Sequence, residues 1–189
     1  MLVQWAPDAR RILEVGCGEG AMTERLRDGY PQARITAIDV TPRLGRLFRG
    51  DRARVRFIQA PVEEIAANEP ASFDLVILSD VLHHVPTELR DSLLRAIGQA
   101  LTPNGIFAFK DWMRERSLIH WACEASDRFL TGDNVAYLTD SEMRGLLAQH
   151  FGPDSLKAER RVRPWSNNVA MLVSHPAWRP PVGSQPDAP

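Results

Sequence analysis

Residues 11–26, RILEVGCGEGAMTERL, place three glycines within five positions directly behind an apolar run. A strand that runs into a glycine-rich turn, and then into a helix from Ala21, is expected to leave unpaired backbone N–H groups and a positive helix end at one edge of a sheet. Gly16 and Gly18 carry no Cβ, so a ligand can approach the backbone closely. The stretch therefore predicts a ligand site at the carboxyl end of a first strand.

A carboxylate follows these glycines at the separation that nucleoside binding requires. Asp39 ends a second apolar run about 20 residues further on, where it can accept hydrogen bonds from both ribose hydroxyls. The site is therefore predicted to bind an adenosine-containing molecule. Gly16, Gly18 and Ala21 also satisfy the dinucleotide pattern G-x-G-x-x-A, so the glycines alone leave a nicotinamide coenzyme open.

Short apolar runs alternate with helical patterns along most of the chain. This order is typical of β-α-β units, which build a parallel sheet with helices on both faces. We expect a Rossmann-like α/β fold with a seven-stranded, mostly parallel sheet. The predicted strands are Arg11–Val15, Arg34–Asp39, Val55–Gln59, Phe73–Ser79, Ile106–Asp111, Leu156–Val162 and Val169–Val173.

Capping residues mark two helix starts. Thr41 followed by Pro42 predicts a helix that begins there, and Thr139 with Glu142 forms a capping-box pattern. A short helical insertion after the fifth strand is predicted across residues 118–129. Apolar residues at helical spacing predict two amphipathic helices, one through Leu89, Leu93, Leu94, Ile97 and Leu101, the other through Met143, Leu146, Leu147 and Phe151.

Length and composition bound the class of protein. A chain of 189 residues with 44% hydrophobic residues can bury one core, so residues 1–175 are expected to form a single domain. The prolines of residues 176–189 predict a disordered tail. No apolar run approaches the roughly 20 residues of a membrane span. Two cysteines, Cys17 and Cys123, supply neither a disulfide framework nor a thiolate metal site, so we expect a cytoplasmic protein without a metal.

Basic residues are unevenly distributed although the formal net charge is −1. Arginine outnumbers lysine by 21 to two. A solvated basic face is the preferred interpretation of one arginine stripe, and an anion or nucleic-acid patch is the alternative. The stripe consists of Arg43, Arg46, Arg49 and Arg52 at three-residue spacing, with Arg54 and Arg56 beyond.

Four segments in a fixed order carry a family resemblance. LEVGCGEG, ITAIDV, FDLVILSDVLHHVP and LTPNGIFAF resemble class I S-adenosylmethionine-dependent methyltransferases over about residues 10–112. The pairing of DVLHHVP with LTPNG looks most like the small-molecule branch of that family. The resemblance implies S-adenosylmethionine as the cofactor and methyl donor.

The resemblance also implies cofactor contacts at the glycine turn. Glu14 and the backbone of Gly16 would hold the methionine amino group, and Gly18, next to Cys17, would make room for the cofactor. Ser79, which ends the fourth strand, would flank the sulfonium.

Contacts with the adenosine are implied further along. Asp39 would bind the ribose hydroxyls, and Val40 would lie against the adenine. Family members often carry an acidic residue after the third strand that bonds the adenine amino group, whereas Pro61 stands at that place here. Backbone groups around Val62, or Glu63, are expected to replace it.

Polar residues after the fourth strand are the candidates for acid–base chemistry. His83 is the preferred general base, with Asp80 orienting substrate or base. As alternatives, either histidine bonds a loop carbonyl, which is the preferred interpretation of His84, and Asp80 caps a helix that begins near Thr87.

The segment 112–138 follows the fifth strand and is expected to close over a small-molecule acceptor, because ligands bind at the carboxyl ends of the strands in an open α/β sheet. Its aromatic residues line this pocket in one interpretation and belong to the core in the other. They are Trp112, Trp121, Phe129 and Tyr137.

We therefore expect an enzyme that moves a methyl group from S-adenosylmethionine to a small-molecule acceptor, to oxygen or carbon in preference to nitrogen, by in-line displacement. A catalytically silent binding module is the alternative. A nicotinamide oxidoreductase is disfavoured because no Tyr-x-x-x-Lys pair is present. Nucleic acid is disfavoured because the fourth strand ends in SDVL, where nucleic-acid amino methyltransferases resemble D/N-P-P-Y/F, and because no Pro-Cys nucleophile occurs.

Overall fold

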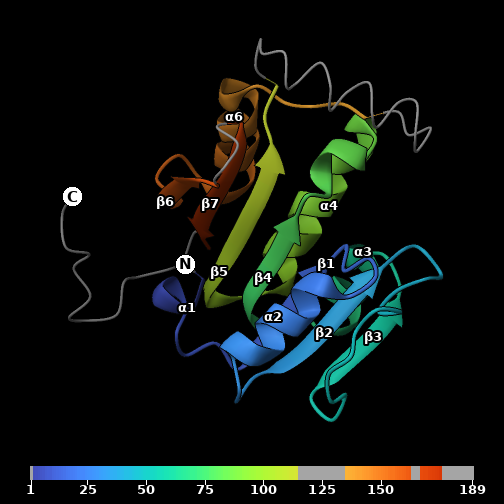
Figure 1. Ribbon diagram of the computed structural model, residues 1–189. Helices are drawn as coiled ribbons and strands as arrows, with labels where there is room; N and C mark the ends of the chain where they lie inside the picture. The colour runs from blue at the N-terminus through green and yellow to red at the C-terminus, as the bar shows by residue number, and fades with distance from the viewer. Residues whose placement is uncertain (1, 115–134, 163–166, 176–189) are drawn as a thin grey trace.

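The computed structural model describes residues 2–114, 135–162 and 167–175, and its described strands form one seven-stranded sheet (Figure 1). The strand order is β3-β2-β1-β4-β5-β7-β6, with every pair from β3 to β5 parallel and β7 antiparallel to both of its neighbours. The predicted Rossmann-like α/β class is confirmed. The strands are β1 (Arg11–Val15), β2 (Arg34–Asp39), β3 (Val55–Gln59), β4 (Phe73–Ser79), β5 (Leu101–Trp112), β6 (Leu156–Arg161) and β7 (Asn168–Ser174).

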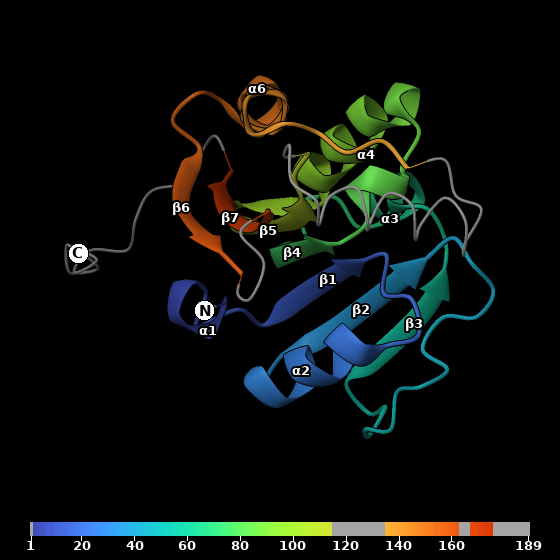
Figure 2. The same ribbon diagram turned by 45° about the horizontal axis from the view of Figure 1, so that its top comes forward.

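Helices cover both faces of this sheet. In Figure 2, α3, α4 and α6 lie above the sheet, whereas α1 and α2 lie below it. A 3₁₀ turn over Leu82–His84 joins β4 to α4. The helices are α1 (Leu2–Trp5), α2 (Ala21–Gly29), α3 (Val62–Asn68), α4 (Thr87–Ala100) and α6 (Asp140–Phe151).

The central strands are apolar on both sides because each side packs against helices. Neighbouring residues of β1 show this, since Ile12 and Leu13 are both fully buried in separate clusters. Ile12 belongs to the cluster that contains Leu26 of α2, and Leu13 belongs to the cluster that contains Leu94 of α4. A strand buried on both faces is typical of a parallel sheet.

The order of the strands places the glycine turn at a topological switch point. The chain leaves β1 for β2 and β3 on one side and then returns to β4 on the other side of β1. Ligands bind outside the carboxyl ends of the strands at such a point. The turn after Val15 therefore lies where the fold itself predicts a site.

Two helix predictions have opposite outcomes. The capping box at the start of α6 is confirmed, because the Thr139 hydroxyl accepts from the backbone N–H of Glu142 and the Glu142 side chain bonds back. The helix predicted from Thr41 is wrong, since residues 41–47 form turns. Gly45 has φ +62°, and its backbone N–H donates to Gly18 rather than along a helix.

Other boundaries differ slightly from those predicted. β5 begins at Leu101, earlier than the predicted start at Ile106, and β7 is one residue longer at each end. The predicted helix over residues 118–129 and the predicted disordered tail over 176–189 lie outside the described residues.

Candidate functional site

A cavity of about 580 Å³ lies at the carboxyl ends of β1, β2, β3 and β4. Its walls come from the glycine turn, the ends of β2 and β3, the β4–α4 connection and one side of α4. The described residues that line it are Val15, Gly16, Gly18, Ile38, Asp39, Val40, Thr41, Ala60, Pro61, Val62, Glu63, Asp80, Val81, His84, Val85, Pro86, Leu89 and Leu93.

The glycine turn shapes one wall of the cavity. Gly18 has φ +48°, and a Cβ built on it would meet no atom within 4 Å, so the space beside it is open to a ligand. Gly16 has φ +74°, and a Cβ there would lie 2.3 Å from the Val81 side chain. The first glycine thus serves close packing, and the second leaves room in the cavity.

The backbone donors of the turn are already used. The N–H groups of Gly16 and Cys17 both donate to the Ile38 carbonyl, at 2.8 and 2.9 Å. The N–H of Gly18 donates to Asp39 Oδ2 at 2.8 Å. Our expectation that these groups would be unpaired is therefore wrong, because the turn bonds to β2. The turn therefore supplies mainly its backbone shape to the site, because its N–H donors are already bonded.

The end of β2 offers an acidic and an apolar group side by side. Asp39 Oδ1 accepts from the backbone N–H of Thr41 at 2.9 Å, which fixes the carboxylate at the cavity wall. Val40 is 69% exposed, the most exposed of the large hydrophobic side chains among the described residues. An exposed aliphatic side chain beside a carboxylate suits a flat apolar base attached to a sugar.

The residues after β3 complete this end of the cavity. Pro61, Val62 and Glu63 all line it, as expected for the place where the family's acidic residue is missing. Glu63 Oε1 accepts from the Ser92 hydroxyl at 3.0 Å, so this carboxylate is tied to α4.

Three predicted cofactor residues lie outside the lining of this cavity. Glu14 is buried beneath the glycine turn, where desolvation raises the pKa of its carboxyl to about 7. Burial likewise raises the pKa of Cys17 to about 12, so its thiol is protonated at neutral pH. Ser79 lines a second cavity on the other face of the sheet.

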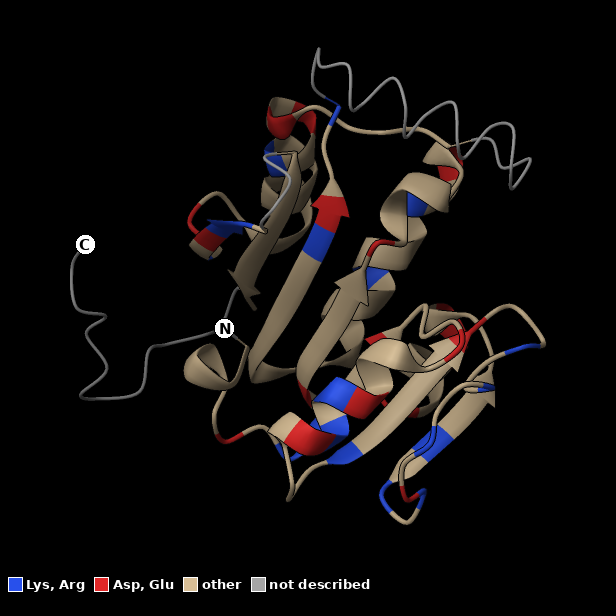
Figure 3. Ribbon diagram, in the orientation of Figure 1, with Lys and Arg blue, Asp and Glu red and all other residues tan. Residues whose placement is uncertain are grey.

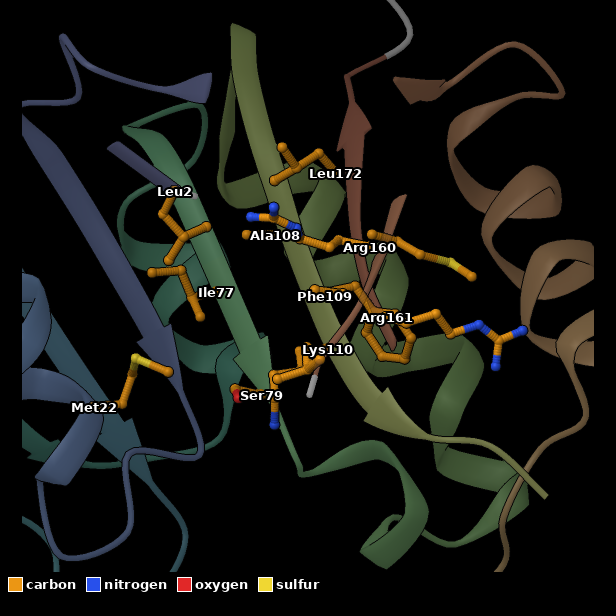
Figure 4. Close-up of a pocket in the computed structure, with 13 residues that line it drawn as sticks. Leu2, Met22, Ile77, Ser79, Ala108, Phe109, Lys110, Arg160, Arg161 and Leu172 are labelled. Atoms are coloured by element: carbon orange, nitrogen blue, oxygen red, sulfur yellow. The ribbon is translucent and has the colours of Figure 1, made fainter. Parts of the chain in front are cut away.

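This second cavity, of about 910 Å³, lies on the face of β4, β5 and β7 that carries α1 (Figure 4). Ser79 and Lys110 lie side by side at its end, and the Arg160 side chain reaches across its apolar floor to Ala108 (Figure 4). The end of β4 therefore borders both cavities, with Ser79 in the second and Asp80 in the first.

Asp80 stands between the two cavities. Its φ of +58° is strained for a residue with a side chain, and such strain gathers at functional sites. Its carboxylate pairs with Lys110 Nζ, 2.6 Å from Oδ1, and accepts from the Ser79 hydroxyl at 3.0 Å. The interpretation of Asp80 as a helix cap is wrong, because α4 begins after Pro86 without a side-chain cap.

The two histidines after β4 occupy different surroundings. His84 is exposed and lines the first cavity. His83 has a side chain only 7% exposed, and its Nδ1 pairs with Asp111 Oδ1. Its ring stacks on Tyr137 with centroids 5.0 Å apart, and Tyr137 is itself buried.

Asp111 was not singled out from the sequence. It ends the predicted fifth strand, and its carboxylate is 2% exposed. A signal was present, since Asp80 and Asp111 directly follow the paired residues Ser79 and Lys110 of two adjacent parallel strands. Side chains at adjacent carboxyl ends meet at the same edge of a sheet.

Basic residues gather along β3 and the segment before it (Figure 3). Several are held by intramolecular partners: Arg46 pairs with Glu19 at 2.6 Å, Arg54 donates to the Ala33 carbonyl at 2.7 Å, and Arg56 pairs with Glu69. Since residues 41–47 form turns, the arginine spacing does not produce a helical stripe.

Among the described residues, no helix is long and apolar enough to span a bilayer. They also contain no group of three or more His, Cys, Asp or Glu side chains arranged to hold a metal ion.

Known proteins resemble the chain in sequence. The family model described as "Methyltransferase domain" matches residues 13–107, half of the chain. A ubiquinone biosynthesis O-methyltransferase of Xanthomonas campestris pv. campestris (strain B100) is 38% identical over 100 residues, 50% of this chain and 40% of that protein. A malonyl-[acyl-carrier protein] O-methyltransferase of Chlorobium phaeovibrioides is 29% identical over 171 residues, 86% of this chain and 60% of that one. The chain thus matches less than two thirds of the length of either relative.

A solved structure shares the fold. The Burkholderia thailandensis 1,6-didemethyltoxoflavin-N1-methyltransferase, with bound 1,6-didemethyltoxoflavin and S-adenosylhomocysteine, superimposes with a TM-score of 0.71 and 22% identity. The superposition covers 92% of this chain and 74% of that one.

Proposed function

Because this chain belongs to the methyltransferase-domain family, as a class I S-adenosylmethionine-dependent methyltransferase, we propose that it transfers a methyl group from that cofactor to a small-molecule acceptor. The observation that carries this proposal is the first cavity. There the opening beside Gly18, the Asp39 carboxylate and the exposed Val40 side chain meet at the switch point of the sheet.

The residues around this cavity suit the cofactor. S-adenosylmethionine supplies a methyl group on a positively charged sulfur, which is already a strong electrophile. Asp39 would accept from the ribose hydroxyls, and Val40 would pack against the adenine. Glu14, beneath the turn, would accept from the methionine ammonium together with the backbone of Gly16 and Cys17.

Two further contacts follow from the placement of neighbouring residues. Backbone groups at Val62 would bond the adenine amino group, because Glu63 is engaged with Ser92. Ser79 would flank the methyl group from the end of β4, beside Asp80.

The acceptor is proposed to be a small molecule methylated on oxygen or carbon in preference to nitrogen. The relatives support this class, since a ubiquinone biosynthesis enzyme and a malonyl-[acyl-carrier protein] enzyme are both named O-methyltransferases. The protein must mainly align acceptor, methyl carbon and sulfur. His83 would take the proton of a hydroxyl acceptor, and Asp80, fixed by Lys110, would orient the acceptor. The low cysteine content favours a protein that acts in a reducing cytoplasm.

The test is transfer of a labelled methyl group from S-adenosylmethionine to a panel of phenols, quinols, carboxylic acids and amines, beside bulk RNA and DNA. We expect labelled small-molecule products. Tight binding of S-adenosylhomocysteine without methylation of any acceptor would favour a silent binding module. Salt-sensitive transfer to nucleic acid that disappears when Arg43, Arg46 and Arg49 are neutralised would overturn the small-molecule class.

A further inference from the structure

We propose that Asp111 is the positioning residue that makes His83 a general base, and that the acceptor is an uncharged hydroxyl, a phenol or an enol, rather than a carboxylate. This inference rests on the proposed methyl transfer and names the acceptor class and the group that holds the base.

The Asp111 carboxylate is built to hold His83. Its Oδ1 pairs with the ring nitrogen Nδ1, and its Oδ2 accepts from the backbone N–H of the same histidine at 3.1 Å. The backbone N–H of Trp112 also donates to Oδ1, at 2.7 Å. One buried carboxylate thus fixes both the ring and the main chain of His83.

This pairing selects one form of the imidazole. An ionised carboxylate only accepts, so Nδ1 must carry the hydrogen and Nε2 must keep the lone pair. Among the described residues, none forms a hydrogen bond with Nε2 of His83. An imidazole with one nitrogen held by a carboxylate and no described partner on the other has the hydrogen-bonding pattern of a general base.

Neighbouring side chains pack around the His83–Asp111 pair. Tyr137 stacks on the ring, with an interplanar angle of 14°, and the His84 ring lies 4.1 Å away between centroids. The buried Arg90 of α4 donates to the carbonyls of Val85, at 3.0 Å, and Ala136, at 2.6 Å. Its guanidinium charge also attracts the charge of Asp111.

The charge around the first cavity decides between acceptor classes. Apart from Asp39 and Glu63 at the proposed adenosine end, Asp80 lines it, and no Lys or Arg occurs among its described lining residues. Lys110, behind Asp80, is already paired. A carboxylate acceptor would therefore meet repulsion. It is also ionised at neutral pH and gains nothing from a base, whereas a phenol or enol remains protonated and does.

The step balances with these groups alone. The acceptor oxygen forms a bond to the methyl carbon as the carbon–sulfur bond breaks and its electron pair stays on sulfur. The hydroxyl proton passes to Nε2 of His83, and the resulting imidazolium, stabilised by Asp111, later releases the proton to solvent. The products are a methyl ether and the neutral thioether form of the cofactor.

Two kinetic variants test the role, with acceptors of graded acidity. Asp111→Asn can donate from its amide to Nδ1, which moves the ring hydrogen to Nε2. We expect it to lower kcat for weakly acidic phenols about 10²- to 10⁴-fold at neutral pH, the usual size of a general-base contribution. The loss should shrink as pH rises and vanish for nitrophenols that are already ionised. His83→Gln, which keeps a side-chain partner for Asp111, should show the same dependence if Asp111→Asn fails to fold.

A matched pair elsewhere supplies the control. His150 Nε2 of α6 and Asp91 Oδ1 of α4 lie 2.9 Å apart. Asp91→Asn replaces the carboxylate of a histidine–carboxylate pair in the same way and should leave turnover unchanged with every acceptor. S-adenosylhomocysteine affinity should be unchanged in all three variants.

Nitrogen-15 NMR of the wild-type histidines gives a readout that needs no turnover. We expect His83 to be protonated at Nδ1, with a downfield exchangeable proton that is absent in Asp111→Asn and retained in Asp91→Asn. Equal losses for acidic and weakly acidic phenols, or His83 protonated at Nε2 in the wild type, would overturn this inference while methyl transfer stands. Methylation of no acceptor by the wild type would overturn the proposed function itself, and this inference with it. Faster methylation of carboxylates than of phenols would contradict the acceptor class.

Discussion

The hydroxyl of Thr23 donates a 2.6 Å hydrogen bond to Oε2 of Glu14, and both side chains are buried beneath the glycine turn. Burial is the main reason why the pKa of Glu14 rises to about 7; the bond from Thr23 opposes the rise, and the charge of Asp39 adds to it. The carboxylate proposed to meet the cofactor's ammonium is therefore held in an environment that disfavours its charge while the cofactor is absent.

Glu14→Gln should stabilise the protein without cofactor at pH 8. Below pH 4.5, its ordinary pKa, the Glu14 carboxyl is protonated in both the folded and the unfolded chain. The stability that the protonated carboxyl contributes is fully present at such pH. As pH rises from 4.5 to about 7, the unfolded chain loses the Glu14 proton first. The free energy of unfolding of the wild type therefore falls by up to about 3 kcal/mol. Glutamine cannot ionise, so the variant should lack this loss.

Chemical unfolding between pH 4.5 and 8 measures the effect, with the exposed Glu64→Gln on α3 as the control. The Glu14 variant should also bind S-adenosylmethionine more weakly, since a charged partner of the ammonium is gone. Parallel pH curves for wild type and Glu14→Gln would show that this carboxyl titrates normally.

Substitutions of Gly16 and Gly18 should separate an effect on folding from an effect on cofactor binding. Gly16→Ala places a Cβ 2.3 Å from Val81, so we expect a clear fall in melting temperature. Gly18→Ala meets no atom within 4 Å and carries only the left-handed φ penalty, about 1 kcal/mol. It should remain folded yet bind the cofactor at least tenfold more weakly. Normal cofactor affinity in folded Gly18→Ala would mean that the ligand does not occupy this opening.

Arg90 should matter for stability far more than its neighbours on α4. It is 3% exposed and bonds the carbonyls of Val85 and Ala136, so Arg90→Met leaves two acceptors without their donor. We expect a loss of about 2–4 kcal/mol in the free energy of unfolding. Arg95→Met, exposed on the same helix, should change it by less than about 0.5 kcal/mol. Equal effects in denaturant titrations would refute a structural role for Arg90.

Local sequence predicted the ligand end of the sheet well, for a physical reason. Parallel strands buried on both faces appear as apolar runs, and each run ends where a polar or glycine residue begins. The bounds of β1, β2 and β4 were therefore predicted correctly, and with them the positions of Asp39 and Ser79.

Predictions that depended on tertiary partners did less well. The segment after Thr41 has a good helix start, but Gly45 and Leu47 bond the glycine turn instead, at 2.8 and 2.9 Å. The partner of His83 lies 28 positions away, and only the pairing of β4 with β5 brings Asp111 to it. Helix and strand propensities depend on neighbouring residues in the sequence, so they cannot predict either contact.

The most direct measurement of the central claim is calorimetric titration of the purified protein with S-adenosylhomocysteine, repeated with Asp39→Ala. We predict binding by the wild type and a ten- to hundredfold weaker Kd in the variant, because a hydrogen bond to a charged acceptor is worth about 1.5–3 kcal/mol. Asp28→Ala, exposed near the far end of α2, should match the wild type. An unchanged Kd in Asp39→Ala, or binding of NADH in place of S-adenosylhomocysteine, would contradict the assignment of this cavity to the methyl donor.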